Sequence, residues 1–194
     1  MPNFRHRLPR AQQRIYDRSN ATSSIRLVAT VRLRRAVAEI PAALVAADRG
    51  RVERLAQAVA EEITTALRVP SVRVLVGSRR PANARGELHG LYTPSSARSQ
   101  GTVHVWMVTA KRGRIVAFNT FLRTILHELC HHLDYVFLKL PDSLHTEGFY
   151  RRESSLFYQV GGSALARRVT SPVAATTEPV RTAGPGDKVA VVTW

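Results

Sequence analysis

The chain has 194 residues, which suits one ordinary domain with additional segments and is too short for two large domains. Apolar residues make up 44% and charged residues 22%, a composition that excludes an intrinsically disordered chain and supplies enough apolar material for a core. The formal net charge is +15, from 29 Lys and Arg against 14 Asp and Glu, and such an excess favours polyanionic partners. The single cysteine, Cys130, excludes an internal disulfide framework and a multi-cysteine zinc cluster.

The sequence also limits where the protein is expected to act. It has no run of 18 apolar residues, which excludes a transmembrane helix, and its N-terminus lacks the apolar stretch of a secretory signal. Residues 1–24 are rich in Arg, Ser and Thr and contain one acid, Asp17. This composition fits an organellar transit peptide and a basic nucleic-acid arm equally well. We otherwise expect a cytoplasmic protein, nucleoid-associated if its arginines contact DNA.

The predicted elements begin with a basic N-terminal extension over residues 1–47. Residues 24–47 suit a helix, although Ile25–Val31 is also compatible with a strand, and Pro41 is expected to break any long helix. The next segment, Asp48–Arg68, has apolar residues three and four positions apart and is predicted to be a helix.

Three short segments rich in β-branched or aromatic residues then predict strands, at Val72–Gly77, Glu87–Thr93 and Val103–Val108. Helical periodicity returns from Val116 to Leu138, and another helix is expected from Ser143 or Thr146 to Tyr158. Residues 169–194 are rich in Pro, Thr, Ala and Gly and are expected to form a flexible tail. The sequence therefore predicts an α+β fold with N-terminal helices, a short three-stranded sheet, a long helix and a following helix.

The predicted long helix contains His127-Glu128-Leu129-Cys130-His131. Because an α-helix turns by 100° and rises by 1.5 Å per residue, the two histidines lie about 40° apart around the axis and about 6 Å apart along it. Both imidazoles can then bind one metal ion, while Glu128 reaches a water on that ion. This HExxH pattern predicts a catalytic zinc site with Glu128 as general base. The alternative is a partly exposed helix whose polar side chains are solvated.

A catalytic zinc site needs a third protein ligand and an open position. The candidates are Asp134, His145, Glu147 and Glu153. Asp134 lies about 10 Å farther along the helix than His127, so we interpret it as a partner of a ligand imidazole. His145 follows a turn that can bring the chain back to the metal, and we favour it. Glu153, 22 residues after the second histidine of the motif, is the alternative.

Together with His145-Thr146-Glu147-Gly148-Phe149, the HExxH motif resembles the SprT-like metallopeptidase family, which includes the Spartan and Wss proteases. In members of that family a later histidine, with an aromatic residue four positions on, supplies the third ligand, and His145 and Phe149 match that pair. The resemblance covers about residues 50–160. The four-cysteine zinc ribbon that follows the protease core in some members has no counterpart here.

The resemblance implies a small zincin-like metallopeptidase domain over residues 48–168 that holds Zn²⁺ through His127, His131 and His145. It implies hydrolysis of peptide bonds in a protein or peptide substrate, with Glu128 as the base. Some members cut proteins that are bound or crosslinked to DNA. Any DNA contact would here use the arginine-rich surface, because the zinc ribbon is absent.

Other polar residues near the motif have less specific interpretations. His132 is expected to be solvated or to support a ligand, and Cys130 to pack among apolar residues. The strand Val103–Val108 is either an interior strand or a sheet edge that binds extended substrate. Four side chains that follow the third ligand in the sequence are candidates to donate a hydrogen bond to an oxyanion. They are Tyr150, Arg151, Arg152 and Tyr158.

An alternative function is a basic nucleic-acid-binding or regulatory protein whose metal site is structural or vestigial. A structural zinc would be closed by a fourth protein ligand, for which Glu147 and Glu153 are candidates.

Overall fold

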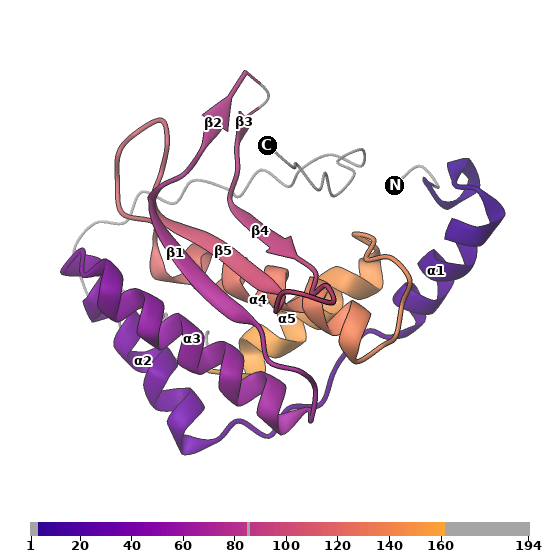
Figure 1. The fold of residues 1–194 in the computed structure, drawn as a ribbon, viewed down its shortest axis with the longest axis horizontal. Coiled ribbons are helices and arrows are strands. Elements are labelled where there is room, and N and C mark those ends of the chain that lie inside the picture. The colour runs from indigo at the N-terminus through magenta and orange to yellow at the C-terminus, as the bar shows by residue number, and fades with distance from the viewer. Residues whose placement is uncertain (1–3, 85, 162–194) are drawn as a thin grey trace.

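The computed structural model describes residues 4–84 and 86–161. The fold is α+β, as predicted: helices come first, a small mixed sheet follows, and two helices end the described part of the chain (Figure 1). The predicted flexible tail, 169–194, lies outside the described residues. The elements are, in chain order, η1 (Phe4–Arg7), α1 (Arg10–Ala21), α2 (Val31–Val45), α3 (Arg49–Ala66), β1 (Arg73–Arg79), β2 (Ala82–Asn83), β3 (Gly86–Glu87), β4 (Gly90–Thr93), β5 (Thr102–Val108), α4 (Phe118–Val136) and α5 (Glu147–Gln159).

The main sheet has the strand order β1-β5-β4. Strands β1 and β5 are parallel, and β4 runs antiparallel to β5. The predicted strand Glu87–Thr93 is divided, because Gly86–Glu87 pairs with β2 in a separate hairpin while Gly90–Thr93 pairs with β5. Strand β5 is central, so the interior alternative holds for it and the edges of this sheet belong to β1 and β4.

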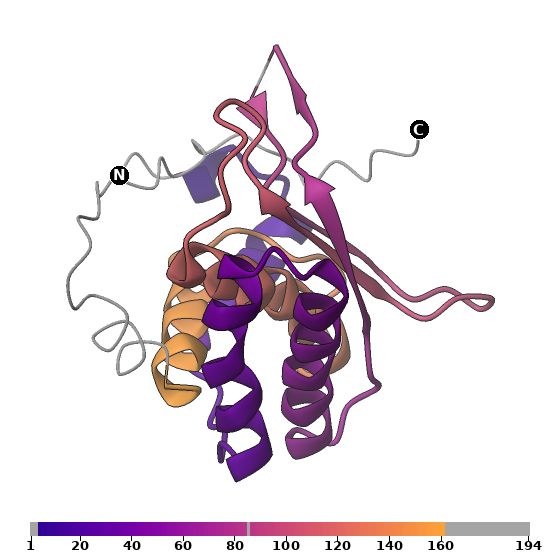
Figure 2. The same ribbon diagram turned by 90° about the vertical axis from the view of Figure 1, so that its left-hand side faces the viewer.

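Helices α2 to α5 lie on one side of the sheet (Figures 1 and 2). Alternate residues of β1 and β5 face them, so that Val74, Val76, Val103 and Val105 are buried in the same apolar cluster as the helices. Val37 of α2 belongs to this cluster too. Part of the predicted N-terminal extension, residues 1–47, therefore contributes to the core. The domain limits that the sequence suggests stay a prediction.

Side chains of α3 cover the outer edge of β1. The Gln57 amide accepts from Val74 N at 2.7 Å and donates to Val72 O at 3.1 Å. One turn earlier Glu53 accepts from Val76 N at 2.8 Å, and Arg49 donates to Val76 O at 3.1 Å. The spacing of four residues places these three α3 side chains in one row along the strand. They take the place of a neighbouring strand, so β4 is left as the edge of the main sheet that α3 does not cover.

The structure corrects the expectation that Pro41 breaks a long helix, because α2 continues through it for 15 residues. A proline inside a helix removes one hydrogen bond to the carbonyl four residues earlier. Here Val37, Ile40 and Leu44 are buried on either side of the proline and hold the helix against the core. Tertiary packing thus outweighs the local penalty.

Residues 25–30 form no strand and lead into α2, which begins at Val31. Gln159 at the end of α5 provides the missing partner. Its side-chain Oε1 accepts from Leu27 N at 2.7 Å, and its Nε2 donates to Ile25 O at 2.9 Å. Ile25 and Leu27 are buried, so these backbone groups need a hydrogen-bond partner inside the protein.

None of the helices in the described part of the chain is long and apolar enough to cross a lipid bilayer.

Replacing Gln159 by Ala should lower the free energy of unfolding by about 1–3 kcal/mol, because two buried backbone groups lose their partner. Urea unfolding followed by circular dichroism measures this loss. Gln100→Ala is the matched control, since Gln100 donates to Ser71 Oγ at an exposed position and its loss should cost less than about 0.5 kcal/mol. Equal losses in the two variants would contradict this role of Gln159.

Candidate metal centre

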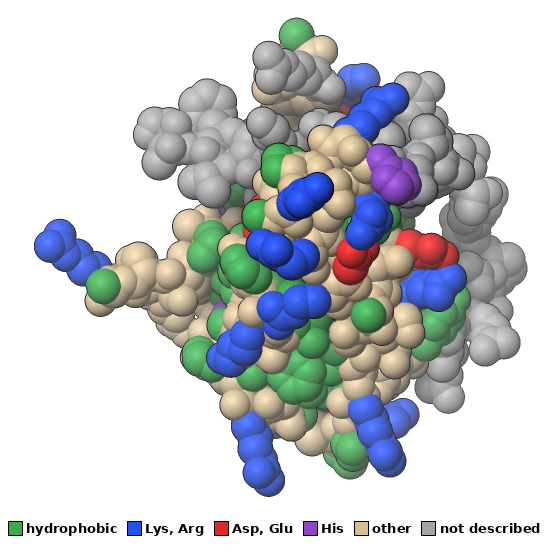
Figure 3. All heavy atoms as spheres, turned by 90° about the vertical axis from the view of Figure 1, so that its right-hand side faces the viewer, with side chains coloured by type: hydrophobic (Ala, Val, Ile, Leu, Met, Phe, Trp, Pro, Cys, Tyr) green, Lys and Arg blue, Asp and Glu red, His purple; other side chains and the backbone are tan. Residues whose placement is uncertain are grey.

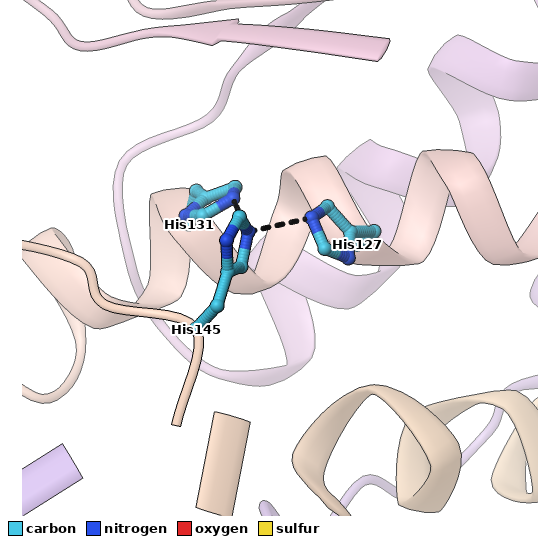
Figure 4. Close-up of side chains that lie close together, drawn as sticks. All are labelled: His127, His131 and His145. Atoms are coloured by element: carbon cyan, nitrogen blue, oxygen red, sulfur yellow. Dashed lines mark hydrogen bonds between the residues drawn. The ribbon is translucent and has the colours of Figure 1, made fainter. Parts of the chain in front are cut away.

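Helix α4 and the segment before α5 bring three histidine side chains together (Figure 4). His127 and His131 lie one turn apart on α4, and His145 approaches them from the loop that precedes α5. The Nε2 atom of His145 lies 3.0 Å from Nε2 of His127 and 3.1 Å from Nε2 of His131. Three imidazole nitrogens therefore converge on one point at the surface of α4.

In each α4 histidine the Nδ1 nitrogen, which faces away from the point of convergence, has a defined partner. Nδ1 of His127 lies 3.1 Å from Oε2 of Glu153, and Oε1 of the same carboxylate accepts from Arg123 at 3.3 Å. Nδ1 of His131 lies 2.7 Å from Ser143 Oγ, whose hydroxyl donates to Asp134 at 2.8 Å. With Glu153 and Ser143 as acceptors, both rings would carry their proton on Nδ1. The Nε2 atoms, which face His145, are then the nitrogens that could bind a cation at the point of convergence.

The donor set fits a zinc ion. The ligand nitrogens of the three histidines all lie within 4.8 Å of one another. Two nitrogens bound to a tetrahedral zinc at about 2.0–2.1 Å lie about 3.3 Å apart, close to the spacings of His145 with its two neighbours. Burial lowers the pKa of His131 well below its ordinary value, which keeps this ring neutral and able to bind a metal. The described residues therefore include a three-histidine site that could hold a metal ion.

Phe149 forms the floor of the site. Its ring is fully buried, and its centroid lies 4.7 to 5.1 Å from those of the three histidines. Tyr150, which is partly exposed, stacks on His145 with a centroid distance of 5.7 Å. The two aromatic rings restrict the rotation of the imidazoles and exclude solvent from one side of the site.

Glu128 is buried beside strand β4. Its carboxylate accepts a hydrogen bond from the Tyr92 backbone, and burial raises the pKa of Glu128 to about 7. Gly90 makes this approach fit, since a Cβ at that position would overlap the Glu128 carboxylate and lie 2.8 Å from Thr124 Cγ2. A cation at the histidines would stabilise the ionised carboxylate and lower this pKa again.

The remaining candidates take other positions. Glu153 contacts the Nδ1 side of His127, away from the converging Nε2 atoms, and Glu147 is exposed and paired with Arg151. Asp134 supports His131 through Ser143, a role close to the one that its position on the helix predicts. Cys130 is buried, as predicted.

His132 is also buried, hydrogen-bonded to the Tyr92 hydroxyl at 3.0 Å and to Pro70 O at 2.8 Å. Of the two expectations for this residue, a solvated position is therefore wrong. Neither of these hydrogen bonds involves the three histidines. They connect α4 to β4 and to the segment before β1.

Sequence reasoning missed Ser143 and gave Arg152 the wrong surroundings. The sequence indicates Ser143 only as a possible helix start, yet its hydroxyl links His131 to Asp134. Arg152 was a candidate oxyanion donor, but it is fully buried and its NH2 group donates to Asp134 at 2.8 Å. A charged residue on the apolar face of α5 was the available signal, because such a residue is rarely buried without a partner.

Comparison of the chain with protein-family models, with curated proteins and with solved structures finds no match.

The parent protein should contain about one zinc per chain, and His145→Ala should lose most of it, because two histidines from one helix leave the coordination incomplete. Mass spectrometry of the untagged native protein, with total metal analysis, measures the content. His104→Ala is the control, since His104 stacks on Trp106 in the sheet, away from the three histidines. Zinc that survives in His145→Ala would contradict the three-histidine site.

Proposed function

We propose that this protein is a zinc-dependent metallopeptidase. The observation that carries the proposal is the convergence of three histidine Nε2 atoms. The helical turn that holds His127 and His131 also holds the buried carboxyl group of Glu128. Three neutral nitrogen ligands with an open fourth position are typical of catalytic zinc, whereas structural zinc sites are closed by four protein ligands.

Each side chain has a distinct part in peptide hydrolysis. His127, His131 and His145 would hold the metal, which when bound supplies Lewis-acid chemistry and lowers the pKa of water to about 7. Glu128 would take the proton of the attacking water and deliver it to the amine that leaves. Phe149 and Gly90 keep the imidazoles and the Glu128 carboxyl in place through packing.

Strand β4 offers the place where an extended substrate would bind. It is the edge of the main sheet that α3 does not cover, its first residue, Gly90, lies against Glu128, and the Tyr92 backbone donates to the Glu128 carboxylate. A peptide that adds to this edge gains backbone hydrogen bonds and passes beside the carboxyl group that would act as base. The β1 edge is covered by α3 side chains and cannot serve in this way.

The resemblance to SprT-like metallopeptidases supports the same proposal. His145 lies at the converging nitrogens and Phe149 packs beneath them, which are the positions that the family motif assigns to a third ligand and its aromatic partner. The evidence for this family remains at the level of these motifs.

Replacing Glu128 by Gln should leave the zinc content unchanged and reduce peptide cleavage by at least a hundredfold, because the amide cannot accept the proton of water. Cleavage of an unstructured protein such as casein, followed by mass spectrometry, provides the assay. Glu61→Gln, an exposed change on α3, serves as the control and should cleave at the parent rate. If the Glu128 variant cleaves as fast as the parent, the proposed mechanism is wrong.

We further propose that the substrates include proteins bound to nucleic acid. Arg10, Arg14 and Arg18 are exposed on α1 at intervals of four residues, and they form one row on that helix. Figure 3 shows the face of the molecule on the α1 side, where basic side chains outnumber acidic ones. A row of arginines at this spacing can contact phosphates along one backbone without reading base sequence.

Binding to a double-stranded oligonucleotide should weaken steeply between 50 and 200 mM salt, because each phosphate contact releases a counterion. Replacing Arg10, Arg14 and Arg18 by Gln should reduce the slope of log K against log salt by up to about three. A fluorescence anisotropy titration measures both. A control triple variant at Arg34, Arg54 and Arg68, exposed on the α2–α3 side, should retain the parent slope. Equal slopes in both triple variants would refute the α1 interface.

A further inference from the structure

The C-terminal end of α1 is packed against the first turn of α5, next to the segment that carries His145. Thr146 caps α5 by accepting from Phe149 N at 3.0 Å, and its hydroxyl lies 3.0 Å from that of Ser19. Asn20 adds a second cap, since its side-chain oxygen accepts from Gly148 N at 2.8 Å. Two backbone N–H groups that an isolated helix start leaves without partners are therefore held with the help of α1.

Gly148 allows this contact. A Cβ at position 148 would lie 2.6 Å from Ser19 O and 2.7 Å from both Cα and O of Asn20. These are backbone atoms, which cannot turn aside as a flexible side chain does. Any larger residue at position 148 must separate the end of α1 from the start of α5.

A buried arginine joins the same part of α1 to the metal site. The Arg152 NH1 group donates to Ser19 O and Thr22 O, both at 2.5 Å, and its NH2 group donates to Ser19 Oγ at 3.0 Å. NH2 also donates to Asp134 Oδ1 at 2.8 Å. Neither Arg152 nor Asp134 is exposed, so each depends on these partners for its charge.

From Asp134 the contacts lead directly to a histidine of the site. Asp134 accepts from Ser143, and Ser143 accepts from His131 Nδ1. The orientation of the His131 ring and the position of its proton thus depend on a chain of hydrogen bonds that begins at the backbone carbonyls of α1. His145 is reached independently, through the shared cap at Thr146.

We propose that the segment Arg18–Thr22 is a working part of the metal centre, with Ser19, Asn20 and Arg152 as positioning residues, so that undocking α1 releases the metal. The inference rests on the metal site of the proposed function but not on peptidase activity. Anything that moves α1, including a polyanion bound to its exposed arginines, would change metal affinity. Thermodynamic linkage requires the converse as well: metal binding must stabilise the docked α1.

The test compares two substitutions of Gly by Ala. Gly148→Ala pushes α1 away without altering any histidine or its direct partners, and should weaken zinc binding at least tenfold, the range seen when groups behind metal ligands are removed. Gly50→Ala is the matched control, because Gly50 is also the second residue of a helix and an added Cβ there meets only side-chain atoms at 3.5 Å or more. Zinc affinity is measured by competition with a chromogenic chelator, on full-length protein.

Two further variants keep the test decisive if Gly148→Ala fails to fold. Asn20→Ala removes one cap, and Arg152→Lys keeps the buried charge but cannot reach Asp134, Ser19 and Thr22 together. Both should weaken zinc binding, and the visible absorption of the Co²⁺-substituted protein should change because the ligand geometry changes. A merely structural role of α1 would lower thermal stability in these variants and leave the Co²⁺ spectrum and the zinc affinity of the folded protein unchanged.

The outcomes separate the two proposals. If the parent binds no zinc, the proposed function fails and this inference fails with it. If the parent and all three variants bind zinc with affinities within about twofold of one another, the metal site stands and the role of α1 is refuted. Hydrogen exchange of the parent gives a second check: zinc should slow exchange of α1 amides, and no change there would also refute the coupling.

Discussion

The ion pair between Arg152 and Asp134 is the interaction on which the arrangement of the centre depends. It is fully buried, and it joins α5 to α4, the helix that carries His127 and His131. Removing one member of a buried pair leaves the other charge uncompensated, at a cost of about 3–5 kcal/mol. Asp134 also accepts from Ser143, and Arg152 also donates to the Ser19 carbonyl of α1. These hydrogen bonds connect the ion pair to the loop before His145 and to the N-terminal helix.

Sequence reasoning was most successful where a local pattern determines the outcome. Helical periodicity identified α3 and α4, a possible helix start at Ser143 or Thr146 indicated α5, and β-branched residues identified β1 and β5. The spacing of His127 and His131 indicated a shared face without any knowledge of the fold. The loop residue His145 was favoured by the turn before it and by the motif resemblance, and the structure places it with the other two.

Sequence reasoning failed where long-range contacts determine the structure. Nothing local in Ile25–Val31 shows that an amide from Gln159 will satisfy its backbone, and nothing near Pro41 shows how firmly α2 is held by the core. Ser143 acquires its role only because α4 and the following loop fold onto each other. Such residues are chosen by the three-dimensional surroundings, which neither periodicity nor spacing encodes.

The row of α3 side chains along β1 has a consequence for the behaviour of the protein in concentrated solution. An exposed strand edge can pair with the edge of another molecule and start aggregation. By occupying the outer N–H and C=O groups of β1, Arg49, Glu53 and Gln57 close that route on one side of the sheet. Self-association by strand pairing in the described sheet is therefore directed to β4, where a second copy would compete for the same hydrogen bonds as an extended peptide.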